Sequence, residues 1–192
     1  MHKGRLEAFS DGVIAIIITI MILELHIPEG DNLEALVSIK SKFLSYVFSF
    51  VFIGIYWNNH HHVLHASKHV NASVLWANLH LLFWLSLVPF VTGWMGESNF
   101  ATIPVAVYGC VLWLSGFSFF ILVRTLVANH DENSVIRILS KDPKGMWSLL
   151  IYTTAIPLAF VDAWIALALY VTVSVMWLIP DKRIENKLSG LE

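Results

Sequence analysis

Three polar residues stand at the start of the first long apolar segment of the chain: Arg5, Ser10 and Asp11. They lead directly into residues 12–23, which are almost entirely aliphatic. An acidic side chain carried into a membrane-length helix is costly, so it normally faces protein or water rather than lipid. The group is therefore a candidate functional site.

A second polar group follows in the next apolar segment, where residues 56–65 read Tyr-Trp-Asn-Asn-His-His-His-Val-Leu-His. A buried carboxylate needs hydrogen-bond donors, and tryptophan, asparagine and histidine side chains supply them. Candidate partners for Ser10 and Asp11 therefore lie among residues 56–65 and among the polar residues of the third segment, Trp76, Asn78, His80 and Ser86. The three consecutive histidines leave the choice among His60, His61 and His62 open.

The histidines also allow two other interpretations. His62, His65 and His69 share one helical face, a spacing compatible with zinc. No HExxH pattern and no acidic residue lies within this cluster, so we expect neither a metal nor another cofactor. A pH sensor is a further possibility, because histidine titrates near about pH 6.5. Most of these side chains are best explained as a polar, aromatic-rich helix end at the membrane interface.

The composition is that of an integral membrane protein. Of the 192 residues, 57% are hydrophobic and 14% are charged, whereas a soluble domain carries about 25% charged residues. The single cysteine, Cys110, excludes an intrachain disulfide and a cysteine-rich metal site. Phosphate-binding, nucleophile-elbow and dinucleotide motifs are absent, so the sequence does not indicate an enzyme. Scattered basic residues give no support for nucleic-acid binding.

We predict an all-α membrane protein with six transmembrane helices in one domain, residues 1–192. A span needs about 20 mostly apolar residues. The candidate segments are residues 6–25, 43–63, 73–94, 103–127, 146–160 and 163–179. The last two are short and nearly contiguous, which predicts a tight helical hairpin. The loop at residues 128–145 could hold one short surface helix.

The distribution of basic residues predicts that both termini are cytoplasmic. Six crossings place both termini on one side, which collects ten of the twelve lysines and arginines. The opposite side has only Lys40 and Lys42, in the loop at residues 26–42, beside the acidic residues Glu24, Glu29, Asp31 and Glu34. Because positive charge accumulates on the inner side, this acidic first loop should face outward.

The first helix carries an aliphatic stripe. Ile16, Ile20 and Leu23 share one helical face, and Phe9 and Gly12 extend it inward. Copies of this helix around an axis would form rings of branched side chains, which can gate ions by excluding water. Such a stripe is also typical of packing or lipid contact. Thr19 lies at its edge and could present a hydroxyl there, or only bond back to the Ala15 carbonyl.

The pattern Arg5-x-x-x-Phe9-Ser10-Asp11 at the start of the first of six helices resembles the signature of the transmembrane protein 175 family. These are lysosomal potassium channels with shorter bacterial and archaeal relatives. The resemblance extends over nearly the whole chain in helix number and orientation. Further matching elements are Trp57 with His60 and His61, Asn78, and residues 86–90, which read Ser-Leu-Val-Pro-Phe.

The resemblance implies a potassium-selective channel in a prokaryotic cell membrane. Animal members hold two six-helix repeats, so this single repeat is expected to form a homotetramer with potassium as the permeant ion. Four copies of the first helix would line the pore, with a constriction at Ile16, Ile20 and Leu23 and with Thr19 favouring potassium. A polar network would hold this helix in place: Arg5, Phe9, Ser10, Asp11, Trp57, His60, His61 and Asn78.

Two further expectations concern how the channel would work. Voltage dependence should be weak, because no helix carries the repeated arginines of a voltage sensor. The alternative function is a proton channel or a proton-coupled transporter that uses Asp11 and the histidines. Broken helices paired around a midplane site would favour a transporter, and only the region of Pro157 hints at one.

Overall fold

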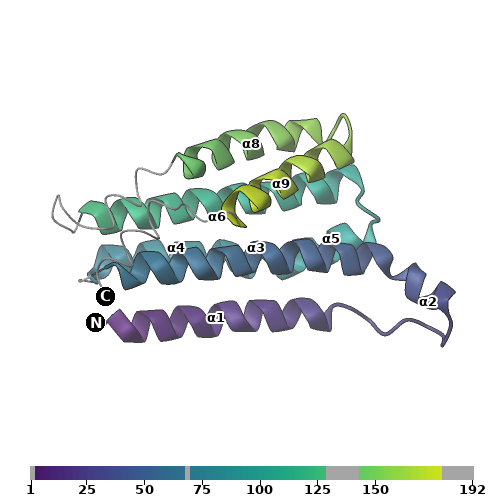
Figure 1. Ribbon diagram of the computed structural model, residues 1–192, viewed down its shortest axis with the longest axis horizontal. Helices are drawn as coiled ribbons and strands as arrows, with labels where there is room; N and C mark the ends of the chain where they lie inside the picture. The colour runs from purple at the N-terminus through teal and green to yellow at the C-terminus, as the bar shows by residue number, and fades with distance from the viewer. Residues whose placement is uncertain (1–2, 68–69, 129–142, 179–192) are drawn as a thin grey trace.

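The structure, a computed structural model, describes residues 3–67, 70–128 and 143–178. Regular structure in these residues is helical (Figure 1). Its helices are α1 (Lys3–Leu23), α2 (Leu33–Ser38), α3 (Lys40–His65), α4 (Ala72–Ser86), α5 (Val88–Glu97), α6 (Thr102–Ala128), α8 (Lys144–Leu158) and α9 (Ala163–Leu178). Helical structure thus covers each of the six predicted segments. By length and composition, α1, the α4–α5 stretch and α6 are each suited to crossing a membrane.

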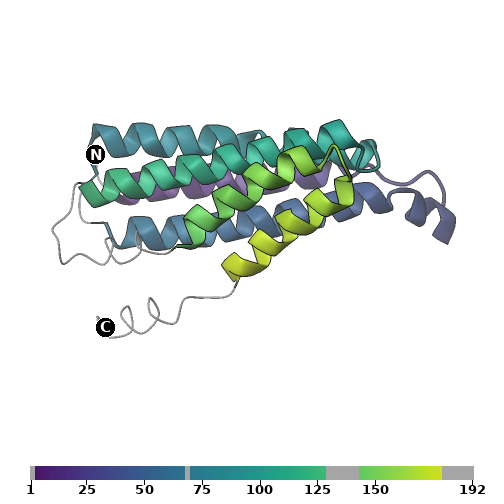
Figure 2. The ribbon, with the colours of Figure 1, turned by 90° about the horizontal axis from the view of Figure 1, so that it is seen from above.

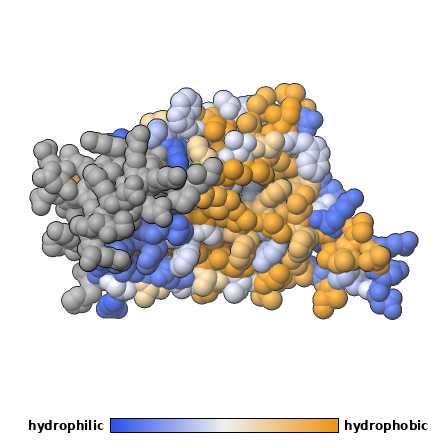
Figure 3. Space-filling model, in the orientation of Figure 1, coloured by the Kyte–Doolittle hydropathy of each residue, from blue (hydrophilic) through white to orange (hydrophobic). Residues whose placement is uncertain are grey.

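The long helices run side by side along the longest axis of the molecule (Figure 1). Helix α1 lies at one edge of the bundle, where it packs against α3, α4 and α5, while α6 packs against α4 and α8. On the face that Figure 3 shows, apolar residues cover the middle of the bundle and hydrophilic residues lie towards its two ends. This banding is expected of helices whose central parts contact lipid.

The third predicted segment, residues 73–94, lies within one candidate membrane span, Ala72–Glu97, which a break divides into two helices. Helix α4 ends at Ser86, and α5 begins at Val88 with Pro89 in its first turn. Proline lacks a backbone N–H, and its ring clashes with the carbonyl four residues earlier, so it is best accommodated in the first turn of a helix. The break therefore falls at Leu87, two residues before Pro89.

Of two connections at one end of the bundle, the sequence predicted one and did not predict the other. Helix α2 lies within the acidic first loop and was not predicted; the Asn32 side chain caps it by accepting a hydrogen bond from the Ala35 amide. The predicted hairpin of α8 and α9 is present, with its turn at the same end as α2 (Figure 2). There the Asp162 carboxylate accepts from the Trp164 amide at 2.7 Å. The predicted surface helix at residues 128–145 lies almost entirely outside the described residues.

Helices α3 and α5 pack closely against each other, from the start of α3 and the end of α5 into the core. A Cβ atom at Gly96 would lie 2.8 Å from the Lys42 Cα, so the two backbones approach too closely for any other residue. Deeper in the core, the Thr92 hydroxyl donates to the Ser49 hydroxyl at 2.6 Å. The Ser49 oxygen is also 3.0 Å from the Tyr108 hydroxyl of α6. Small and hydroxyl-bearing residues at such interfaces let membrane helices pack tightly.

Candidate functional site

Helix α1 has one buried face and one exposed face. Its buried residues, which include Leu6, Ser10 and Ile14, point into the bundle. The predicted stripe lies on the opposite face, where the exposed fraction is 51% for Phe9, 58% for Ile16, 41% for Ile20 and 76% for Leu23. A single copy of the chain therefore leaves the whole stripe uncovered. Gly12 is exposed beside it, with open space around its Cα.

Thr19 lies on this exposed side of α1, and its hydroxyl donates to a backbone carbonyl of the same helix. The acceptor is Ile16, at 2.9 Å, rather than the Ala15 carbonyl that we considered from the sequence. Because a hydroxyl keeps two acceptor lone pairs when it donates its proton, the Thr19 oxygen remains able to face a cation.

On the buried side of α1, a chain of hydrogen bonds joins three helices. The Nε2 atom of His60 lies 2.7 Å from the Asn78 Oδ1. The Asn78 amide donates to the Ser10 oxygen at 2.9 Å, and the Ser10 hydroxyl donates to the Leu6 carbonyl at 2.9 Å. The residues His60, Asn78 and Ser10 are each at most 1% exposed. This arrangement ties α1 to α3 and α4 with its buried polar groups bonded.

Asp11 makes a separate contact with α3. Its carboxylate accepts a hydrogen bond from the Trp57 indole at 3.0 Å. His61 stacks on the Trp57 ring, with centroids 6.3 Å apart, and on the His65 ring at 5.9 Å. Of the three consecutive histidines, His60 is therefore the one bonded to Asn78, while His61 and His62 are exposed.

Arg5 is exposed and falls on the face of α1 that carries Phe9 and Ile16. Within the described part of the chain, no hydrogen bond or ion pair joins its guanidinium to another residue. The place of Arg5 in the polar network that holds the first helix stays a prediction. The sequence analysis did not predict the ion pair between the neighbouring residues Lys3 and Glu7, whose Nζ and Oε1 atoms lie 3.7 Å apart. Their spacing of four residues on a helix is the pattern that could have predicted it.

The predicted zinc ligands His62, His65 and His69 cannot be compared with the structure as a set, because His69 lies outside the described residues. Among the residues that are described, no group of three histidine, cysteine, aspartate or glutamate side chains could hold a metal ion. Hydrogen bonds or ring stacking engage the described histidines His60, His61, His65 and His80.

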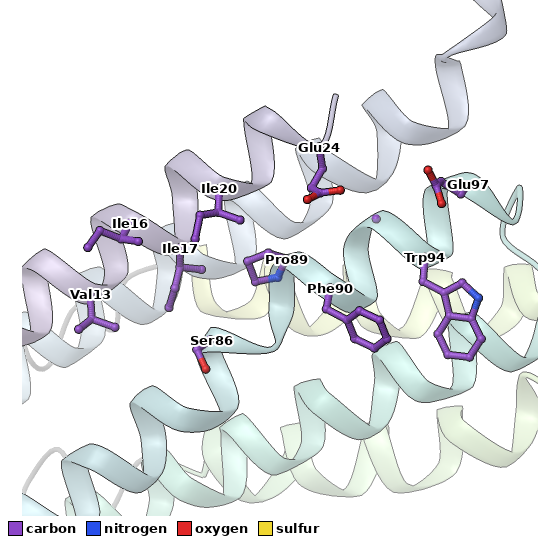
Figure 4. A pocket seen from close by; sticks show the side chains of 11 residues that line it. Val13, Ile16, Ile17, Ile20, Glu24, Ser86, Pro89, Phe90, Trp94 and Glu97 are labelled. Carbon is purple, nitrogen blue, oxygen red and sulfur yellow. The ribbon is translucent and has the colours of Figure 1, made fainter. Parts of the chain in front are cut away.

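An apolar groove of about 720 Å³ lies between α1 and the α4–α5 break (Figure 4). Ile16 and Ile20 form part of one wall, and Pro89, Phe90 and Trp94 form the other. Glu24 and Glu97 stand at one end of the groove in Figure 4. The sequence did not predict this groove, and Pro89 within an apolar run was its only signal.

The described residues thus define an all-helical membrane protein whose first helix is fixed by a buried polar network and exposes an aliphatic stripe. The family model described as endosomal/lysosomal potassium channel TMEM175 matches residues 5–89, which include nearly all of α1 and the whole of α2, α3 and α4. A protein named as a potassium channel, from Chryseobacterium sp. (strain P1-3), is 51% identical over 189 residues, 98% of each chain. The chain belongs to the TMEM175 family, a family of ion channels and not of enzymes.

Two other similarities bear on function. The crystal structure of a lysosomal potassium-selective channel TMEM175 homolog from Chamaesiphon minutus superposes with a TM-score of 0.80 at 25% identity. The match covers 92% of this chain and 96% of that one. The human relative is named an endosomal/lysosomal proton channel; it is 36% identical over 96 residues, which are 43% of this chain and 19% of the human protein.

Proposed function

We propose that this protein is a potassium-selective channel whose pore is lined by α1. The observation that carries the proposal is the uncovered aliphatic stripe on the same helix that bears the polar signature at its start. The names of the bacterial relatives support potassium as the permeant ion, and the fold of the Chamaesiphon homolog supports the same architecture. No cofactor is required besides the permeating ion.

Ile16, Ile20 and Leu23 form the constriction in this proposal. Their exposed fractions in a single copy mean that only other copies, lipid or water can cover them. Rings of branched aliphatic side chains exclude water from a narrow pore, and so gate ions without a charged filter. Ile16 lies midway along the stripe and forms the narrowest ring. The Thr19 oxygen, next to this ring, favours potassium over sodium.

In this proposal, copies of the chain assemble through the same exposed face of α1. Four copies form a homotetramer in which the α1 helices surround a central axis. The tetramer lies in the cell membrane of a prokaryote. Each copy has six spans, and both of its termini are on the cytoplasmic side. The Ser10–Asn78–His60 network and the Asp11–Trp57 bond then hold α1 at a fixed angle against α3 and α4. Arg5 extends the polar contacts to the neighbouring copy. Voltage dependence is weak, because no helix carries a row of arginines.

The direct experiment is ion flux into liposomes that contain the purified protein, with a potassium gradient compared with a sodium gradient. We expect flux under the potassium gradient and much less under the sodium gradient. Replacing Ile16 with asparagine should raise the leak and lower selectivity, since a polar ring keeps the constriction wet. Unchanged flux and selectivity in the Ile16→Asn variant would rule out Ile16 as the gate.

The second candidate function is proton conduction, which the name of the human relative favours. Asp11, His61 and His65 belong to one connected group, in which Asp11 bonds to Trp57 and His61 stacks on both Trp57 and His65. This function predicts flux driven by a pH gradient in the absence of potassium. Flux under the pH gradient alone, with none under the potassium gradient, would replace the potassium proposal.

A further inference from the structure

A row of aromatic side chains on α6 leads to an arginine near the end of that helix. The row consists of residues spaced four, three and four positions apart, which share one helical face: Trp113, Phe117, Phe120 and Arg124. The rings of Trp113 and Phe117 stack with their centroids 5.2 Å apart, and the Arg124 Cζ lies 4.9 Å from the centroid of the Phe120 ring. Cation–π attraction therefore holds a positive charge at one end of an apolar surface.

The row borders the contact between α6 and α8. The Trp113 indole donates to the Thr153 hydroxyl at 2.9 Å, and a Cβ atom at Gly116 would lie 3.5 Å from the Leu149 Cδ2. Helix α8 lies at the edge of the bundle opposite α1 (Figure 1). An assembly with α1 at its centre therefore turns the seam between α6 and α8 away from the axis and towards lipid. This orientation rests on the proposed function, and the seam shares no residue with the stripe of α1.

The depth of the row matches one leaflet of a bilayer. Helix α6 has 27 residues and is about 40 Å long, so it extends beyond a hydrocarbon core of about 30 Å by about 5 Å at each end. Arg124 precedes the last residue of α6, Ala128, by about 6 Å. Its Cα thus lies at the boundary of the hydrocarbon, where lipid phosphates begin. Trp113 lies about 16 Å deeper, near the bilayer midplane.

The Arg124 guanidinium is available to an anion. The residue is exposed, and among the described residues no carboxylate forms an ion pair with it. A ring face attracts the cation but does not neutralise its charge, and an unpaired charge at an apolar boundary is costly. A guanidinium offers parallel N–H donors that fit phosphate oxygens bidentately. The anion that membranes present at this depth is the phosphate of a phospholipid.

We propose that the seam between α6 and α8 binds an anionic phospholipid. Its phosphate pairs with Arg124, and one acyl chain follows Phe120 and Phe117 towards Trp113. A zwitterionic lipid binds less well, because its headgroup carries a cation beside the phosphate and that cation is repelled by the guanidinium. Free phosphate lacks the chain that the aromatic row contacts. The bound lipid lies on the face of the bundle away from α1, so binding does not require conduction.

The test is photolabelling of the intact protein in phosphatidylcholine nanodiscs. One probe is a phosphatidylglycerol with a diazirine on its acyl chain, and the other is a phosphatidylcholine with the same chain. Mass spectrometry of the digested protein locates the labels. We expect the phosphatidylglycerol probe to label residues 113–124 about fivefold more than the phosphatidylcholine probe, the effect of one basic residue near a membrane surface.

Three variants complete the design. Arg124→Gln should lower labelling by phosphatidylglycerol about fivefold and leave labelling by phosphatidylcholine unchanged. Arg124→Lys should restore labelling relative to Arg124→Gln, because the charge returns without the planar fork. Lys40→Gln removes the same charge from an exposed residue at the opposite end of the bundle, so it should leave labelling of residues 113–124 unchanged.

Three outcomes would overturn the proposal. Equal labelling of residues 113–124 by the two probes would mean that the headgroup charge plays no part. An equal loss in Arg124→Gln and Lys40→Gln would mean that net charge, rather than this arginine, attracts the lipid. Labelling by neither probe would mean that the seam is not open to lipid. Potassium flux of the same preparation in liposomes reports the proposed function separately, so failure of the lipid site and failure of the channel are distinguished.

Discussion

Replacing Asn78 with leucine tests the buried network most sharply. The asparagine is fully buried, accepts from His60 at 2.7 Å and donates to Ser10 at 2.9 Å. Leucine has a similar volume but makes neither bond. The change leaves the buried imidazole N–H of His60 without its acceptor, while the Ser10 hydroxyl keeps its bond to the Leu6 carbonyl.

The expected cost has two parts. Hydrogen bonds between membrane helices are worth about 0.6 kcal/mol each, so the two lost bonds amount to about 1 kcal/mol. Stranding a buried donor adds about 1–3 kcal/mol. The total of about 2–4 kcal/mol should lower the melting temperature by about 5–15 °C for a chain of this length.

The assay is thermal unfolding of the purified protein in detergent, followed by tryptophan fluorescence and by the assembled fraction after heating. Asn59→Leu is the matched control, because among the described residues the Asn59 side chain bonds only to the Ile55 carbonyl of its own helix. The Ser10→Ala and Asn78→Leu changes should be non-additive when combined, since they remove the same bond. A loss no larger for Asn78→Leu than for the Asn59 control would refute the reasoning.

Two further predictions concern assembly and packing. Asp11→Ala should lower the yield of the tetramer rather than only its conductance, because the carboxylate bonds Trp57 and lies off the pore stripe; gel filtration of the purified variant measures this. Gly96→Ala should destabilise the protein by about 1–3 kcal/mol, because the new methyl overlaps the Lys42 Cα and the Ser45 hydroxyl; thermal unfolding measures this.

Each of these predictions has its own control and its own contrary result. An Asp11→Ala variant with normal tetramer yield and altered conductance would place Asp11 in the ion pathway instead. For the glycine, Gly93→Ala is the matched change on the same helix, where a methyl has ordinary contact only. Equal melting temperatures for the two glycine variants would show that α3 and α5 are not packed as closely as the structure places them.

The sequence predicts the positions of the main helices because long apolar runs specify them directly. Segment boundaries agree with the observed helices to within a few residues for α1, α6, α8 and α9. The break at Leu87 was missed because its flanking residues are as apolar as a continuous span, and only Pro89 marked it. Helix α2 was missed because six residues in a charged loop leave no periodicity to detect.

The polar site was predictable in its residue types but not in its pairing. Three consecutive histidines point in directions about 100° apart on a helix, so only the packing of α3 against α4 decides that His60 meets Asn78. Helical periodicity likewise identified the stripe at Ile16, Ile20 and Leu23. It could not distinguish a face that packs inside the chain from one that the chain leaves uncovered.

The central claim is that this uncovered face of α1 lines the pore, and silver accessibility of single cysteines tests it most directly. In a Cys110→Ser background, Ile16→Cys places a thiol on the stripe, whereas Ile22→Cys places one on an exposed part of α1 outside it. Potassium flux into liposomes is measured before and after Ag⁺ is added. We predict that Ag⁺ blocks the Ile16→Cys variant and leaves the Ile22→Cys variant unaffected. Block of the Ile22→Cys variant alone, or equal effects on both, would contradict a pore lined by this stripe.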